Sequence, residues 1–223
     1  HLIRKIVMST GAVSTLAGST SSGSTDATGT SARFNYPRSI TTDGTNLYVA
    51  DRYAIRKIVI SSGVVTTLAG GFQVPSGIII DGTNLYVADT GNHRIRKIVI
   101  ATGAVTTFAG SGSSGSTDAT GTAATFKKPN AITTDGTNLY VADTENHIVR
   151  KIVISTGVVT TLAGSAGSQG STNGTGTAAR FRYPRAITTD GTDLYVSDTN
   201  NHAIRKVVIS SGAVTTFAGH AGS

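Results

Sequence analysis

The sequence lacks several residue types on which common protein chemistries depend. It has no cysteine and no tryptophan, one methionine and four prolines among 223 residues, and only 6% of its residues are aromatic. The absence of cysteine excludes disulfide bonds, thiolate metal sites and thiol catalysis. No apolar run reaches the roughly 18–20 residues that cross a bilayer as a helix, so membrane insertion is not expected.

Charged residues are also scarce, and basic residues outnumber acidic ones. Charged residues make up 14% of the chain, and 19 Lys and Arg against 12 Asp and Glu give a net charge of +7. Ten of the basic residues form five Arg-Lys pairs in recurring segments. Binding to a phosphate backbone needs clustered, unpaired Arg and Lys, so this distribution disfavours a nucleic-acid partner. Weak polyanion binding through the basic excess stays open as an alternative.

Three short phrases recur along the chain and indicate a repeat architecture. Asp-Gly-Thr-Asn/Asp-Leu-Tyr-Val starts at Asp43, Asp81, Asp135 and Asp190. Arg-Lys followed by an aliphatic run occurs five times, and so does Thr-Leu/Phe-Ala-Gly. The copies lie within one chain, so they report how it is built.

Each unit predicts four short strands, for example 131–134, 139–142, 149–154 and 158–163. The strands are apolar or β-branched runs separated by Asp-Gly and Ser/Thr-Gly turns. Segments such as 85–88 are apolar on both faces, as sheets buried on both sides require. Four-stranded meanders packed face to face around an axis have this pattern. The sequence therefore predicts an all-β fold, a β-propeller of four-stranded antiparallel blades.

The segment Val-Ala-Asp-Thr-Gly-Asn-His-Arg-Ile-Arg-Lys at 87–97 resembles the NHL repeat, which is named for an Asn-His-Leu signature. Related stretches occur at 143–151 and 198–206, and the resemblance covers essentially the whole chain. It implies a propeller, in most members six-bladed, that serves as a binding platform, with a minority of enzymes. The segment 51–55 departs from the pattern, because it lacks the Asn-His pair and is two residues shorter.

The chain is interpreted as a single propeller or propeller fragment over 1–223. An N-terminal half blade at 1–18 precedes four whole blades at 39–70, 77–110, 131–164 and 186–219. Long Gly/Ser/Thr-rich connections occupy 19–38, 111–130 and 165–185. A half blade leaves edge backbone unpaired. We expect the missing strands to come from the rest of a longer chain or from another copy.

The long connections and the Asn-His turns are predicted to emerge on one face of the propeller. Loops of about 20 residues usually carry function or disorder. Basic and aromatic residues alternate in two of them, an arrangement able to stack on sugars or bases. The alternative interpretation is packing, with Phe34, Phe126 and Phe181 filling gaps between blades. The candidate binding residues of these loops are Arg33, Tyr36, Arg38, Lys127, Lys128, Arg180, Arg182, Tyr183 and Arg185.

Two irregularities of the repeat fall at the junction between the first two whole blades. The turn at 51–55 is shortened, and the connection at 70–77 lacks the long insertion. Two short segments flanked by long connections predict a notch on the loop-rich face. Its predicted rim is Arg52, Tyr53, Phe72 and Gln73.

No catalytic or metal-binding constellation is evident. His93, His147 and His202 occupy equivalent positions, with His1 at a fourth, which favours a turn-stabilising role. The sequence has no Gly-X-Ser-X-Gly, phosphate-loop or His-Glu-X-X-His motif. No cofactor is predicted. The Asp-Gly-Thr-Asn/Asp turns lack the ligand series of a calcium loop, and Asp26 and Asp118 in the long connections are slightly better candidates for an oxygen-ligated cation such as a structural calcium ion. Each Arg-Lys pair is expected to form an ion pair with the Asp that ends the preceding strand, as Arg150 with Asp143.

These features favour a non-catalytic binding or scaffold module that uses the face with the long connections. The expected partner is a protein or a glycan, and the expected location is extracellular or on a bacterial cell surface. The alternative is a propeller enzyme of the lyase or hydrolase type with a metal in its central channel. That alternative requires a His or Tyr that breaks the repeat.

Overall fold

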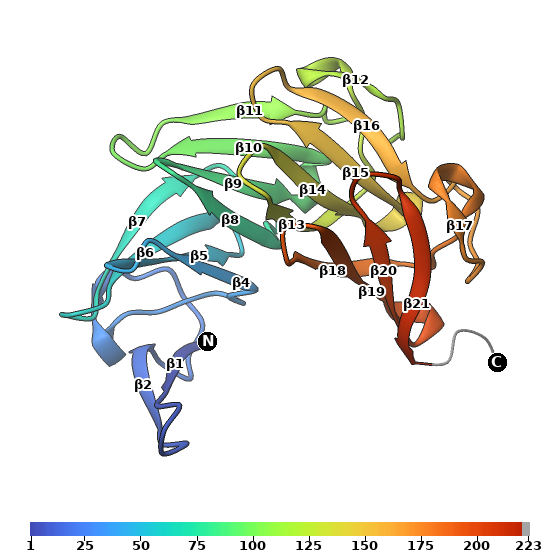
Figure 1. Cartoon of the computed structure of the whole chain (residues 1–223). Coiled ribbons are helices and arrows are strands. Elements are labelled where there is room, and N and C mark those ends of the chain that lie inside the picture. The colour runs from blue at the N-terminus through green and yellow to red at the C-terminus, as the bar shows by residue number, and fades with distance from the viewer. Residues whose placement is uncertain (220–223) are drawn as a thin grey trace.

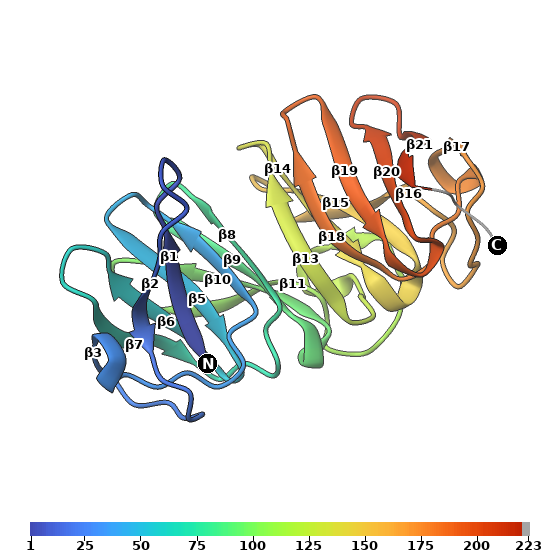
Figure 2. The same ribbon diagram turned by 90° about the horizontal axis from the view of Figure 1, so that it is seen from below.

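The computed structural model describes residues 1–219, which form an all-β propeller of four-stranded antiparallel blades. Four whole blades and an N-terminal half blade follow one another around an arc (Figure 1). The first strands of the whole blades lie innermost (Figure 1), and those of successive blades contact one another, as the strands at Pro129–Thr134 (β13) and Pro184–Thr189 (β18) do side by side in Figure 2. No helix among the described residues is long and apolar enough to cross a membrane.

Each blade is one meander of neighbouring strands. The half blade consists of β1 (Leu2–Ile6) and β2 (Val13–Gly18). Blade 1 has β4 (Ser39–Thr42), β5 (Asn46–Asp51), β6 (Ala54–Val59) and β7 (Val64–Gly70), and blade 2 has β8 (Gly77–Asp81), β9 (Asn84–Asp89), β10 (Arg94–Val99) and β11 (Val105–Ala109). Blade 3 has β13 (Pro129–Thr134), β14 (Asn138–Asp143), β15 (Ile148–Val153) and β16 (Val158–Ala163), and blade 4 has β18 (Pro184–Thr189), β19 (Asp193–Asp198), β20 (Ala203–Val208) and β21 (Ala213–Gly219).

The recurring Asp-Gly-Thr-Asn phrase builds the turn between the first two strands of a blade. Asp43 Oδ1 accepts hydrogen bonds from the backbone N–H groups of Thr45 (2.9 Å) and Asn46 (2.6 Å), and the Tyr48 hydroxyl donates to Oδ2 (2.8 Å). Hydrogen bonds from Asn46 and these other donors hold the pKa of Asp43 well below its usual value. The Asp is therefore a turn-forming residue.

The hydrophobic core lies between successive blades. One cluster joins Tyr86 and Ile95 of blade 2 to Leu139 and Ile152 of blade 3, with Phe126 between them. Equivalent clusters lie at the other blade junctions. Because both faces of the sheets in blades 1 to 3 meet a neighbour, the middle strands of these blades are apolar on both faces, as the sequence predicts.

The three long connections are ordered straps, and this corrects the expectation that they project from one face. They contain the short strands β3 (Ala27–Thr28), β12 (Ala119–Thr120) and β17 (Gly174–Thr175), each hydrogen-bonded to the outermost strand of the following blade. At the far end of one strap, Gly121 N–H donates to Gly157 O (2.8 Å) in the turn between β15 and β16. That turn lies on the face opposite to the one where the strap begins. Each strap thus runs down the outer rim and back, because its backbone groups find partners on the exposed edge strand.

Candidate functional site

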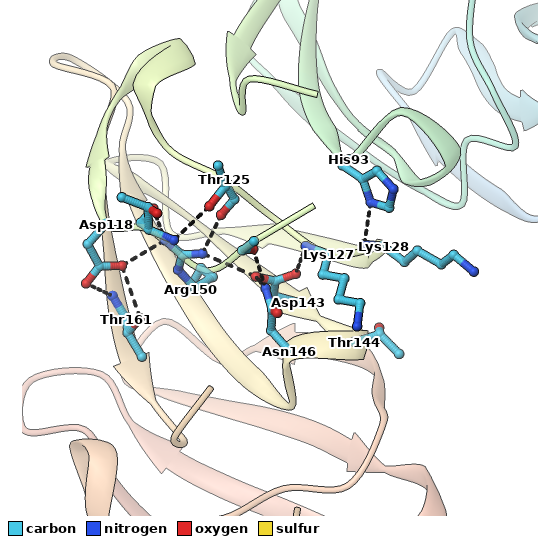
Figure 3. Close-up of polar contacts among 12 residues, drawn as sticks. His93, Asp118, Thr125, Lys127, Lys128, Asp143, Thr144, Asn146, Arg150 and Thr161 are labelled. Atoms are coloured by element: carbon cyan, nitrogen blue, oxygen red, sulfur yellow. Dashed lines mark hydrogen bonds and ion pairs between the residues drawn. The ribbon is translucent and has the colours of Figure 1, made fainter. Parts of the chain in front are cut away.

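A buried arginine locks each strap to its blade. Arg150 on β15 donates from Nη2 to Asp118 Oδ1 (2.7 Å) and from Nη1 to Asp143 Oδ2 (3.2 Å) (Figure 3). It also donates to the backbone carbonyls of Thr117 (3.0 Å) and Thr125 (2.9 Å), which lie on the two legs of the strap. The guanidinium on β15 therefore ties both legs of the strap to the end of β14.

The same network recurs in blades 1 and 4. Arg56 pairs with Asp26 (2.6 Å) and Asp51 (3.4 Å). Arg205 pairs with Asp198 (2.9 Å), and Asn173 takes the position of the strap aspartate (2.7 Å). The ion pair predicted between Arg150 and Asp143 is confirmed. The carboxylates of Asp26 and Asp118 also face cationic guanidinium groups, an environment that opposes the binding of calcium.

The aromatic positions Phe34, Phe126 and Phe181 are fully buried, which confirms the packing interpretation. Each ring lies beneath the guanidinium of the buried arginine of its blade, at 5.2, 5.0 and 5.4 Å from Cζ to the ring centroid. The strap phenylalanine therefore fills the wedge between blades and contacts the locking arginine through a cation–π interaction.

The repeated histidines connect neighbouring blades. Nδ1 of His93 accepts a hydrogen bond from the backbone N–H of Lys128 (3.0 Å) in the following blade connection (Figure 3), and Nδ1 of His147 accepts one from Tyr183 (3.2 Å). Both histidines have left-handed backbones, with φ of 56° and 61°. Burial lowers the pKa of His93 and of His147, which favours the neutral ring that can accept. The imidazoles of His93 and His147 thus bond to the next blade connection and not within their own turns, and a turn-stabilising role of the side chains stays a prediction.

Blade 1 makes this connection without a histidine. The backbone carbonyl of Arg52 accepts a hydrogen bond from Val74 N–H (2.9 Å), and the carbonyl of Tyr53 accepts one from Phe72 N–H (3.3 Å). Backbone atoms of the shortened turn thus replace the imidazole. The side chains of Arg52 and Tyr53 are left to face outward.

Those two side chains form a surface cluster with Tyr36. We call these three residues and Arg38 the notch. Arg52 Nε donates to the Tyr53 hydroxyl (3.0 Å), and its Cζ lies 5.3 Å from the Tyr53 ring centroid and 5.6 Å from that of Tyr36. The rings are 48% and 57% exposed. A surface pocket of about 180 Å³ is lined by Tyr36, Arg38, Arg52 and Val74. The notch offers two guanidinium groups and two aromatic faces for recognition.

The structure brings together parts of the two predicted sets. Tyr36 and Arg38, predicted as loop residues, lie beside Arg52 and Tyr53, predicted as the rim. Gln73 is exposed at the same junction, and its backbone N–H donates to Asp89 Oδ1 (2.8 Å). Phe72 is only 4% exposed and belongs to the core, where Arg96 lies over its ring. It fills the wedge as the strap phenylalanines do, so it has no place on an exposed rim.

The remaining predicted residues lie at other blade junctions. Lys127 and Lys128 pair with Glu145 (4.0 and 3.0 Å), and Arg180 donates to two carbonyls of its own strap. Tyr183 packs edge to face against His147, with 4.6 Å between the ring centroids. Arg33, Arg182 and Arg185 are exposed.

Within residues 1–219 no three His, Asp or Glu side chains gather as metal ligands do. Sequence reasoning missed that Tyr36 belongs with Arg52. The signal was available, because Tyr36 and Val74 occupy the same offset before a proline in successive blades.

Comparison with known proteins agrees with this architecture. Residues 72–98, which span the first three strands of blade 2, match the family described as NHL repeat. A segment of the chain is 34% identical over 107 residues to NHL repeat-containing protein 2 of Bos taurus. That match covers 46% of this chain and 15% of the bovine protein.

Solved structures share the fold at low sequence identity. An auxiliary nutrient binding protein from Bacteroides thetaiotaomicron superposes with a TM-score of 0.74 at 18% identity over 100% of this chain and 54% of its own. A structure of a nidogen/laminin complex gives 0.69 at 17% identity, covering 99% and 72%. A streptogramin B lyase gives 0.57 at 14% identity, covering 81% and 54%. The chain thus spans about half the length of the nutrient binding protein.

Proposed function

Since this chain is an NHL-repeat propeller, we propose that it is a non-catalytic binding module whose partner docks at the notch formed by Tyr36, Arg38, Arg52 and Tyr53. The observation that carries the proposal is the break in the repeat. At this junction both the turn and the blade connection are short, which leaves Tyr53 exposed and Arg52 half-buried beside Tyr36 and Arg38 of the connection that enters blade 1. A packing role accounts for Tyr36, which meets His1 edge to face as Tyr183 meets His147, but not for the half-exposed Tyr53 ring beside the Arg52 guanidinium.

The chemistry of the notch favours a partner that carries carboxylate groups. Among the described residues, neither Arg38 nor Arg52 forms an ion pair with an acidic side chain. Guanidinium groups bind carboxylates through paired hydrogen bonds, and tyrosine rings stack on sugar or peptide planes. An acidic glycan or an acidic protein surface fits both features.

The partner is proposed to be met outside the cell or at a bacterial cell surface. The cysteine-free sequence and the Ser/Thr/Gly-rich straps are consistent with such a module. Nucleic acid is a weaker candidate, because the buried guanidinium groups of Arg56, Arg150 and Arg205 are committed to the protein itself.

The enzyme alternative finds its support in the likeness to streptogramin B lyase, which at 14% identity is a likeness of fold. The use of His93 and His147 as acceptors between blades supports the non-catalytic proposal instead. Metal analysis of the purified protein separates the two. A stoichiometric transition metal would favour the enzyme.

The test of the binding proposal uses three immobilised probes, a hyaluronan hexasaccharide, an uncharged chitohexaose and a hexaglutamate peptide. Saturable binding to at least one of the two charged probes is expected, and Arg52→Ala with Tyr53→Ala should weaken it about tenfold or more. The matched control is Arg182→Ala with Tyr183→Ala, which removes the same charge and ring type from the junction of blades 3 and 4. Failure to bind either charged probe, or an equal loss in the control, contradicts the proposal.

A further inference from the structure

Blade 2 is the whole blade without a strap. Its sheet has four strands with β11 at the outer edge, whereas the other three whole blades have a fifth strand there. The connection that precedes it, 71–76, leads directly from β7 to β8. An unpaired edge strand presents a row of backbone donors and acceptors to any extended chain that fits.

The three straps show what such an edge accepts. Their sequences read Thr-Asp-Ala-Thr-Gly-Thr at 25–30 and 117–122, and Thr-Asn-Gly-Thr-Gly-Thr at 172–177. In blade 3, Ala119 and Thr120 pair with Val159 and Val158. Asp118 accepts from the backbone N–H (3.0 Å) and the hydroxyl (3.1 Å) of Thr161, and from Arg150. Recognition therefore combines a short β ladder with one side chain that accepts from the arginine, an aspartate in two straps and an asparagine in the third.

Blade 2 has the blade residues that contact a strap in the other blades. Arg96 pairs with Asp89 (3.3 Å) and lies over Phe72, as Arg150 pairs with Asp143 and lies over Phe126. The side chain of Arg96 is 16% exposed, while those of its three counterparts are fully buried. Within the described part of the chain, Arg96 forms no ion pair with a second acidic residue, and no side chain from outside blade 2 bonds Thr107, the counterpart of Thr161.

The spacing of the blades also leaves room for a strap. A Cβ added at Gly103, in the last turn of blade 2, would lie 2.6 Å from the Leu68 carbonyl oxygen of blade 1. The same atom added at Gly212 of blade 4 would lie 2.7 Å from the Leu162 carbonyl oxygen. Blade 4 holds its strap at this separation, with Gly176 N–H bonded to Gly212 O (3.0 Å).

We propose that the free edge of β11 binds an extended peptide segment of a partner protein with the strap pattern Thr-Asp-Ala-Thr-Gly, its aspartate pairing with Arg96. The segment adds a fifth strand along 103–105, and its aspartate accepts from Arg96 and from Thr107. This is β-strand addition with one charged anchor. The site lies on the outer rim and is independent of the notch, so it goes beyond the proposed function.

The test is a titration of the ¹⁵N-labelled protein with a peptide copying residues 115–124, followed by NMR. Saturable shifts are expected at 103–107, with a peptide carrying Lys in place of Asp binding about tenfold more weakly or not at all. Shifts confined to β7, β16 or β21 would mean that the peptide displaces existing straps. The proposal would be overturned by that outcome, by a failure to saturate at roughly millimolar peptide, or by equal binding of the Lys peptide.

A second variant tests the same edge from within the chain. Residues 111–125 are inserted between Gly70 and Phe72 in place of Gly71, which gives blade 2 a strap of its own. The chimera is expected to melt at a higher temperature and to lose the peptide-induced shifts at 103–107. A folded chimera that still binds the peptide there would contradict the proposal. If the chimera does not fold, the peptide titration on the natural chain is the deciding test.

Discussion

Nη2 of Arg150 lies 2.7 Å from Oδ1 of Asp118, although 32 residues separate them in the sequence. The contact joins the middle of a long polar connection to the third strand of a blade. It converts a Gly/Ser/Thr-rich segment into a strap on the outer rim. The junction after blade 1 has no strap, and there the side chains of Arg52 and Tyr53 reach the surface.

The ion pair is expected to hold the strap in place. Asp118→Ala removes three hydrogen bonds, but the carboxylate is 47% exposed, so the free energy of unfolding should fall by only about 1–2 kcal/mol. Asp118→Asn should lose less, because Asn173 occupies the same position in blade 4. Urea denaturation measures both, and hydrogen exchange should show faster exchange within 111–128. Equal losses in the two variants would contradict this account.

Removal of the arginine should cost more than removal of its strap partner. Arg150→Met leaves the fully buried Asp143 carboxylate without its cation, so the free energy of unfolding should drop by about 3–5 kcal/mol. Arg150→Met combined with Asp143→Asn should recover part of that loss. A double-mutant cycle in urea measures the coupling. Additive losses would show that the two residues do not stabilise each other.

His147 is expected to make stability depend on pH. Burial lowers its folded pKa below the usual 6.5, the nearby charges being Lys127, Asp198, Glu145 and Arg182. The unfolded chain therefore binds the proton more readily, and the contribution of His147 is present above pH 6.5 and is lost as pH falls through the lowered pKa. Protonation also removes the acceptor for Tyr183 N–H.

The measurement is the difference in unfolding free energy between wild type and His147→Asn from pH 7.5 to pH 5. Asn tolerates the left-handed backbone and does not titrate. Below pH 6.5 the unfolding free energy of the wild type should fall relative to that of the variant. Burial raises the pKa of Asp143 to about 6, a contribution of opposite sign that is present in both proteins and cancels. A difference that stays constant with pH would exclude this role of His147.

Two glycines separate backbone strain from close packing. Gly136 and Gly164 both have positive φ, 84° and 94°, but a Cβ at Gly136 meets no atom within 4 Å, whereas one at Gly164 would lie 2.7 Å from His147 O. Gly136→Ala should cost about 1–2 kcal/mol from φ alone. Gly164→Ala should cost roughly twice as much, because the strand must also move. Thermal melts of the two variants check the order, and equal shifts would contradict it.

The blade architecture could be predicted because it follows from local signals. Alternating turns and apolar runs give the strands, and the pairing of Arg150 with Asp143 follows from neighbouring strands of one meander. The course of the straps could not be predicted in this way. A segment such as 19–30 has no apolar pattern, and its position depends on one aspartate that meets an arginine about 30 residues away.

The candidate site was predictable in part for the same reason. Arg52 and Tyr53 stand out because they break the repeat. The burial of Phe72 could also have been predicted, because Phe72 occupies the same position in the repeat as Phe34, Phe126 and Phe181. Tyr36 approaches Arg52 within blade 1, where Arg52 N–H donates to Asn35 O (3.0 Å), and its signal in the sequence was the offset before a proline that it shares with Val74.

The most direct test compares the notch with the straps in one binding experiment. Binding of the hyaluronan hexasaccharide and of hexaglutamate is measured for the wild type, for Arg52→Ala with Tyr53→Ala, and for Asp118→Ala. The account predicts that the notch variant loses affinity for any probe the wild type binds, while Asp118→Ala retains it. Full binding by the notch variant together with loss in Asp118→Ala would show that the straps carry the function.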